Sequence, residues 1–173
     1  MDNCLAIGEF AVIELLNHHL ANVKKVTVKS EKEKTKYQKY QIPVVVNLSL
    51  FNKTIKKEDI YAYAEFTPYL MKLNPNTTHL LFTDLNDEGE IGTILRTAVA
   101  FDYFDVALIN CSIDLFSPKL IRASTGAIFM MNVEKFNSLS EYQKKYKNKN
   151  ILFKNNGTPL SLEVGAKLYQ LKI

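Results

Sequence analysis

Several features that mark common protein classes are missing from this chain of 173 residues. It has no tryptophan and only two cysteines, Cys4 and Cys111, which lie far apart and form no CxxC pattern. This excludes a disulfide scaffold and a cysteine zinc site, so a reducing cytoplasm is the expected compartment. No run approaches the roughly 20 consecutive apolar residues of a membrane span, and the first residues lack the basic character of a secretory signal. We therefore expect no membrane partner.

Motifs that hold nucleotides or metals are missing as well. There is no GxxxxGK[ST] phosphate loop, and Gly89 and Gly92 are spaced wrongly for a GxGxxG dinucleotide fingerprint. The three histidines form no ligand set, so no metal is expected. Acidic residues do cluster around one turn, at Asp84, Asp87, Glu88 and Glu90. They suit either the cap of a helix N-terminus or an acid/base pair or Mg²⁺ site.

Arginine is the scarcest charged residue in the chain. Of 22 basic residues only Arg96 and Arg122 are arginines, and the others are lysines. Where lysine replaces arginine almost everywhere, a surviving arginine is a candidate for a task that needs the guanidinium group. Its planar fork donates two parallel hydrogen bonds to phosphate or carboxylate, which an ammonium group cannot do. Survival by chance is the alternative.

Hydrophobic patterning divides the chain into two α/β parts. In the first part we expect a helix at residues 5–21, a strand at 24–29, a solvated helix at 30–40, a buried strand at 43–47 and a strand at 59–66. In the second part we expect strands at 79–85, 106–110, 129–133 and 151–153, and helices at 90–101, from Ser117 onward and at 140–146. Residues 73–77 are the expected linker between a small domain, 1–72, and a larger one, 78–173. Strands that alternate with helices predict a parallel sheet covered on both faces.

Positive charge is concentrated in two segments. Residues 24–39 hold seven lysines against Glu31 and Glu33, and residues 144–149 hold four more lysines. Tyrosines lie among them, and lysine interleaved with aromatic residues suits a polyanion such as RNA. The candidates for RNA contact in the first segment are Lys24, Lys25 and Lys36. A solvated helix face without a nucleic-acid role is the alternative.

Two segments concentrate the chemistry, and each holds one of the two arginines. The first contains GEIGTILRTA, residues 89–98, and the second reads SPKLIRASTGAIF, residues 117–129. Each lies at a junction of strand and helix, and parallel α/β sheets bind ligands outside the carboxyl ends of their strands. In the first segment Arg96 follows Gly92 by four residues, so the two share a helix face. The glycine has no side chain that would block the arginine.

The two segments resemble the SpoU (TrmH-like) family of RNA ribose 2′-O-methyltransferases in the SPOUT superfamily. The family's first motif reads roughly N-x-G-x-[IL]-[IL]-R-T-A, and its second reads P-K-x-[IV]-R-A-S-x-G-A-[IL]-F. The resemblance covers residues 79–135, and residues 5–70 look like the small RNA-substrate-binding domain that many members carry. It implies a parallel-sheet α/β domain with a trefoil knot, S-adenosylmethionine as cofactor, rRNA or tRNA as substrate, and a homodimer.

The resemblance also implies roles for single residues. Arg96 is expected to help activate the ribose 2′-hydroxyl, and Glu90 lies in the same catalytic motif. On the RNA side the second motif implies Arg122 and Ser124, and on the cofactor side Thr125 and Gly126. Because a ribose hydroxyl is a very weak acid, orientation and electrostatics must lower the barrier.

One departure from the family pattern lies in the first motif. Glu90 stands where the family has an asparagine, and a carboxylate only accepts hydrogen bonds whereas an amide also donates them. Glu90 has the charge to pair with Arg96 and so to occupy it. Arg122 in turn has a structural alternative, which is to tie its helix to a carboxylate such as Glu90 or Asp87.

A second departure concerns the third family motif, which reads G-N-E-G and then S-L-N-V. The chain has no GNEG, and residues 167–173 resemble the strand that precedes it, so on this alignment the chain stops short of the cofactor loop. A second alignment sets residues 161–164 on S-L-N-V. We therefore expect an incomplete SPOUT-like domain that binds S-adenosylmethionine weakly or not at all when alone. A catalytically inactive, RNA-binding or ribosome-associated remnant of the family is the alternative function.

Overall fold

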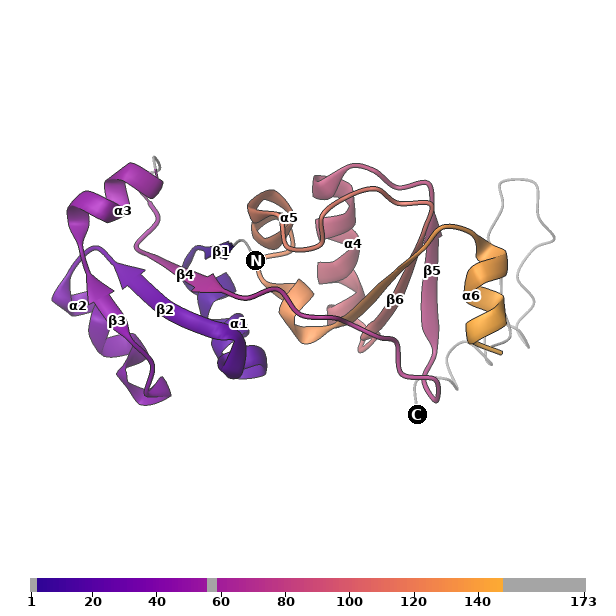
Figure 1. Cartoon of the computed structure of the whole chain (residues 1–173), viewed down its shortest axis with the longest axis horizontal. Helices are drawn as coiled ribbons and strands as arrows, with labels where there is room; N and C mark the ends of the chain where they lie inside the picture. Colours follow the sequence, from indigo (N-terminus) through magenta and orange to yellow (C-terminus); the bar gives the residue numbers. More distant parts are fainter. Residues whose placement is uncertain (1–2, 56–58, 148–173) are drawn as a thin grey trace.

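The structure is a computed structural model that describes residues 3–55 and 59–147, and it has two parts, each built on its own sheet (Figure 1). The first part contains β1 (Cys4–Ile7), α1 (Glu9–His19), β2 (Val23–Val28), α2 (Glu31–Lys34), β3 (Val44–Val46), α3 (Leu48–Thr54) and β4 (Ala62–Phe66). The second part contains β5 (His79–Thr83), α4 (Glu88–Ala100), β6 (Asp105–Ile109), α5 (Pro118–Ala123), β7 (Asn132–Phe136) and α6 (Leu139–Lys145). Short 3₁₀ helices are η1 (Leu20–Asn22), η2 (Thr35–Tyr40) and η3 (Ala127–Met130). No helix among the described residues is long and apolar enough to cross a membrane.

The two sheets differ in their strand directions. The first has the order β1-β4-β2-β3, with β4 antiparallel to both β1 and β2 and with β2 parallel to β3. The second has the order β5-β6-β7, and its strands are all parallel. Their last residues pair with one another, Thr83 with Ile109 and Ile109 with Phe136, so the carboxyl ends form one edge. The parallel sheet expected in the second part is confirmed.

The start of the chain differs from the helix expected at 5–21. Residues Cys4–Ile7 form β1, which pairs with β4, and α1 begins only at Glu9. Between them Gly8 has a φ of 103°, and its amide donates a hydrogen bond to the Ala62 carbonyl at 3.0 Å. A short apolar run fits a strand or a helix equally well, and here pairing with a strand far along the chain decides the outcome.

Two predictions about strands were wrong. One concerned the burial of the strand expected at 43–47, and the other concerned the start of the strand expected at 129–133. β3 lies at the edge of the first sheet, where only β2 pairs with it, and Val45 is 38% exposed rather than buried. The strand expected at 129–133 begins only at Asn132. Gly126, with a φ of 84°, turns the chain into η3 first, and this turn delays the strand.

The helical segments of the first part also differ from expectation. The solvated helix expected at 30–40 is divided into α2 and η2, and its Tyr37 is buried. α3 was not expected, although Asn47 caps it by accepting a hydrogen bond from the Leu50 amide at 2.8 Å. The strand expected at 151–153 and both alignments of the third motif fall outside the described residues.

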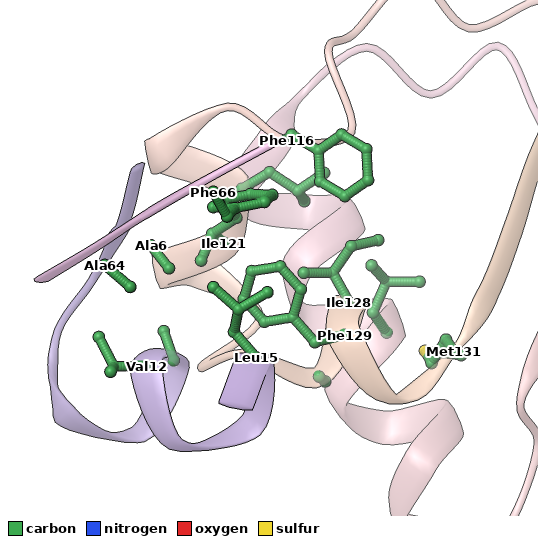
Figure 2. Close-up of a cluster of buried hydrophobic side chains, with 14 of the residues drawn as sticks. Ala6, Val12, Leu15, Ala64, Phe66, Phe116, Ile121, Ile128, Phe129 and Met131 are labelled. Atoms are coloured by element: carbon green, nitrogen blue, oxygen red, sulfur yellow. The ribbon is translucent and has the colours of Figure 1, made fainter. Parts of the chain in front are cut away.

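One cluster of buried hydrophobic side chains extends across both parts (Figure 2). Val12 and Leu15 of α1 belong to the same buried cluster as Ile121 of α5 and Phe129 of η3. The ring of Phe66, from β4, meets the ring of Phe129 edge to face, with 5.5 Å between the centroids. This shared core positions the second arginine-bearing segment against α1. The division into domains at 1–72 and 78–173 stays a prediction.

The expected linker, residues 73–77, is held against the second sheet by hydrogen bonds. Buried Asp105, at the start of β6, accepts bonds from the Asn74 amide and the Thr77 hydroxyl, both at 2.7 Å. The Nε2 of His79 donates to the Asn74 carbonyl at 2.7 Å. Because Asp105 and His79 are buried, breaking these bonds would leave buried polar groups without compensation.

Candidate functional site

The two arginine-bearing segments meet where α4 packs against α5. Gly92 of α4 is buried, and an ideal Cβ built on it would lie 2.5 Å from the Cβ of Ala123 and 2.8 Å from the amide nitrogen of Ser124. No side chain fits into this space, so the glycine sets the distance between the helices. The relative position of the two motifs therefore depends on Gly92.

Short polar side chains define where both helices begin. Asp87 caps α4 by accepting a hydrogen bond from the Glu90 amide at 2.8 Å, and Ser117 caps α5 by accepting one from the Leu120 amide at 3.1 Å. The bond from the Glu90 amide, helped by the charge of Lys119, holds the pKa of Asp87 below its ordinary value. Of the two interpretations of the acidic turn, the helix cap is the one that Asp87 adopts.

A polar bridge links the two helix starts. The Glu88 carboxylate accepts a hydrogen bond from the Ser117 hydroxyl. The Nζ of Lys119 lies 3.5 Å from Glu88 and 3.8 Å from Asp87. Within residues 3–55 and 59–147, no group of three or more His, Cys, Asp or Glu side chains is arranged to hold a metal ion.

Both arginines are exposed on the surface of their helices. Neither Arg96 nor Arg122 forms an ion pair or a hydrogen bond with any residue that the structure describes. The sequence suggested Glu90 as a partner of Arg96, and Glu90 or Asp87 as a partner of Arg122. None of these pairs forms among the described residues, and the cation beside Asp87 is Lys119. Among the described residues, the two guanidinium groups are thus unengaged.

The turn after α5 packs against the first part of the chain. Ser124 is buried, and its hydroxyl donates to the Ile121 carbonyl at 3.0 Å. Exposed Thr125 follows with a φ of 53°. An ideal Cβ on Gly126 would lie 2.9 Å from the Cα of Ala11, so the glycine permits close approach to α1. The assignments of these residues to RNA and cofactor stay predictions.

The lysines of residues 24–39 are less free than their sequence suggests. Lys25 lies 2.9 Å from the Glu65 carboxylate, and Lys24 donates a hydrogen bond to Asn3. Lys36 donates to Glu9 at 2.8 Å, and this bond raises the pKa of Lys36. Carboxylates from distant segments, which a count within the segment omits, therefore offset part of the positive charge.

Sequence reasoning missed a polar crevice at the carboxyl ends of β5, β6 and β7. It has a volume of about 310 Å³ and is lined by Asn86, Asn110, Cys111, Ser112 and Asn137. Near its rim, Asp84 and Asn110 both have left-handed backbone conformations, with φ values of 59° and 53°. The available signal was polar residues following three consecutive strands, which is where parallel sheets bind ligands.

A second hollow, of about 370 Å³, lies between α4 and β5 and is apolar. Its lining includes Leu80, Phe82 and Phe101. The hydroxyls of its two threonines, Thr93 and Thr97, donate to carbonyl groups one turn earlier in α4. Neither threonine hydroxyl is therefore free to donate a hydrogen bond to a polar ligand.

Comparison of this sequence with known protein families and curated proteins identifies relatives among RNA methyltransferases. A sequence model of the SpoU rRNA Methylase family matches residues 77–167. An uncharacterized tRNA/rRNA methyltransferase of Synechocystis is 34% identical over 67 residues, which make up 39% of this chain and 24% of that protein.

Solved structures share the fold. The SpoU methyltransferase AviRb from Streptomyces viridochromogenes, in complex with the cofactor AdoMet, has a TM-score of 0.66 and 16% identity over 83% of this chain and 58% of its own. An RNA 2′-O ribose methyltransferase has a TM-score of 0.62 and 21% identity over 83% of this chain and 59% of its own. The chain thus spans less than two thirds of each relative's length. The likeness confirms the expected fold class.

Proposed function

The chain belongs to the SpoU rRNA Methylase family, and on that premise we propose that it serves the transfer of a methyl group from S-adenosylmethionine to a ribose 2′-hydroxyl of rRNA or tRNA. The observation that carries the proposal is the pair of exposed arginines, Arg96 and Arg122, on two helices that Gly92 holds together. A second copy of the chain is the proposed protein partner, as the family resemblance implies.

The protein's share of this reaction is orientation and charge stabilisation. The ribose 2′-oxygen would take up the methyl group that S-adenosylmethionine supplies when bound, and the hydroxyl proton would pass to solvent. In this proposal Arg96 donates two parallel hydrogen bonds to a phosphate beside the ribose, or stabilises the developing negative charge on the 2′-oxygen. The charge of Lys119, between the two helix starts, is already shared with Asp87 and Glu88, whereas the two arginines have no described partner.

S-adenosylmethionine supplies an activated methyl group when it is bound. The described residues do not form a cradle for it at Gly126, because Ala11 and Glu14 fill the space in front of that glycine. We therefore derive no step through the cofactor. The role proposed for this part of the chain is to position RNA.

The proposal is tested by incubating the full chain with S-adenosylmethionine that carries a labelled methyl group and with unmodified total RNA. A 2′-O-methyl group protects the neighbouring phosphodiester bond from alkali, so labelled, alkali-resistant dinucleotides are the expected product. Arg96→Lys should abolish this product, whereas Lys53→Met, an exposed change on α3, should leave it unchanged. Label in bases or in protein instead of ribose would contradict the proposal.

A second candidate function is RNA binding without methyl transfer. The observation that favours it is Glu90, an exposed carboxylate at the position of the family asparagine, which accepts hydrogen bonds but donates none. Wild-type chain that retains RNA in a filter assay but yields no labelled ribose would select this second function over the first.

A further inference from the structure

The polar crevice is built by one asparagine from beyond each of three neighbouring strands. Asn110 directly follows β6 and Asn137 directly follows β7, while Asn86 lies three residues after the end of β5. Because the three parallel strands end in register, their amides converge on one cavity. Nothing in the two arginine-bearing motifs accounts for these three side chains.

The hydrogen bonds of the crevice leave a specific set of groups unused. The Oδ1 of Asn86 accepts bonds from both the amide and the hydroxyl of Ser112, each at 3.0 Å. The Nδ2 of Asn110 donates to Asp84. Within the described residues, the Nδ2 of Asn86, the Oδ1 of Asn110 and the whole side-chain amide of Asn137 have no partner. The crevice thus presents both donors and acceptors.

These groups fit a flat, neutral ligand with a mixed hydrogen-bonding edge. The lining consists of amides, one hydroxyl and one thiol, and it includes no charged side chain, so a phosphate or a carboxylate finds no counter-charge there. Asparagine matches the adjacent donor and acceptor of a nucleobase edge, as in its bidentate pairing with adenine. A volume of about 310 Å³ reaches the lower end of the range for small-molecule sites.

We propose that this crevice receives one unstacked base of the RNA and reads its edge through Asn86, Asn110 and Asn137. The inference rests on the proposed function, because a ribose hydroxyl inside a stacked helix is difficult to reach. Proteins that read RNA by sequence bind splayed-out bases through their edges, and enzymes acting on nucleotides take them out of the stack. A base in the crevice would hold its ribose at the edge of the sheet from which α4 and α5 start.

Asn137→Ala tests the crevice most directly, because the Asn137 side chain forms no hydrogen bond with any described residue. Its removal leaves the hydrogen bonds between Asn86 and Ser112 intact. Asn52→Ala is the matched control, since Asn52 is also exposed but lies on α3 in the first part. Each full-length protein is titrated with short single-stranded oligoribonucleotides and with abasic oligomers that keep the ribose-phosphate backbone. The ratio of the two affinities isolates the contribution of the bases from that of the phosphates.

We expect the wild type and Asn52→Ala to bind intact RNA more tightly than abasic RNA by the same factor. Asn137→Ala should lower that factor by about fivefold, the equivalent of one net hydrogen bond, and leave the affinity for abasic RNA unchanged. An unchanged factor in Asn137→Ala would overturn the assignment of the crevice but leave the proposed function standing. Absence of any RNA binding by the wild type would overturn both.

The same base-edge chemistry occurs in the adenine of S-adenosylmethionine, and a second titration separates the two sources. Calorimetry with S-adenosylmethionine should show no difference between Asn137→Ala and Asn52→Ala. A loss of cofactor affinity in Asn137→Ala, with an unchanged ratio of intact to abasic RNA, would assign the crevice to the cofactor and overturn the RNA-base proposal.

Discussion

Gly92 of α4 and Ala123 of α5 approach so closely that a methyl group on the glycine would lie 2.5 Å from the alanine Cβ. The same methyl group would lie 2.7 Å from the Ala123 carbonyl carbon, which is a backbone atom and cannot rotate away. One glycine thus brings together two segments that each carry one of the chain's arginines. The contact links the packing of the second part directly to the candidate site.

We expect Gly92→Ala to destabilise the protein despite the better helix propensity of alanine. Alanine gains about 1 kcal/mol over glycine in a helix interior. Overpacking typically costs about 1 to 3 kcal/mol, and the upper end applies because backbone atoms must move. Urea unfolding should therefore give a lower midpoint for Gly92→Ala. Gly89→Ala on the same helix is the control, since it meets only the side chain of Asp87. A rise in stability of both variants would contradict the close packing.

Sequence reasoning succeeded where one local signal sufficed. The starts of α4 and α5 follow from Asp87 and from the pair Ser117 and Pro118, because a cap needs only residues within one turn. It failed where a residue far along the chain determines the local structure. β1 was taken as helix because its partner β4 lies about 60 residues away, and Gly126 could not be matched with Ala11 from spacing alone.

The candidate site shows the same division. The two motifs could be found from their letters, whereas their contact at Gly92 and Ala123 became visible only in the structure. The exposure of Arg96 and the pairing of Lys36 with Glu9 depend on tertiary packing, which no pattern in one segment encodes. The crevice needed the strand register, because its asparagines are separated by more than 20 residues in the chain.

The pH dependence of stability should include a contribution from His19. Its Nε2 donates to the Phe129 carbonyl at 2.9 Å, and its ring stacks on Tyr69 with 3.9 Å between centroids. Burial lowers the pKa of His19 below its ordinary value of 6.5, and the neighbouring charge of His18 acts in the same direction. The unfolded chain therefore takes up this proton more readily than the folded protein. The stability that this difference contributes is present above the ordinary pKa of 6.5 and is lost as the pH falls through the lowered pKa of the folded state.

The measurement is the urea midpoint at about pH 7.5 and about pH 5.5, on either side of the ordinary histidine pKa. The wild type should lose more stability between the two values than His19→Gln, whose amide donates to the same carbonyl without titrating. Equal losses in the two proteins would show that His19 titrates alike in the folded and unfolded chain.

RNA binding should distinguish the arginine fork from simple charge. Arg96→Lys keeps the charge but loses one of two parallel hydrogen bonds, so we expect a loss of about tenfold in affinity with an unchanged salt dependence. Lys36→Ala should cost less, since Glu9 already pairs with this lysine, and should reduce the salt slope by at most about 0.7.

A filter-binding series over several salt concentrations, beside melting curves, measures both effects. Arg122→Lys belongs in the same series, because the structure gives Arg122 no described carboxylate partner and hence no reason to lose stability. Equal losses that depend only on salt in all three variants, with unchanged melting, would show that the arginines are ordinary surface charges.

The last prediction concerns Glu90, which stands where the family has an asparagine. Its side chain is exposed in the first turn of α4, the helix that also bears Arg96. It is therefore a candidate neighbour of bound RNA. Glu90→Asn removes a negative charge near the expected phosphate and supplies an amide that both donates and accepts hydrogen bonds. We therefore expect higher RNA affinity and a higher yield of alkali-resistant labelled dinucleotides.

Asp59→Asn removes the same charge from an exposed position in the first part, so it reports the effect of net charge alone. Equal gains in the two variants would mean that position 90 has no role beyond its charge, and its place in the catalytic motif would then have to be given up.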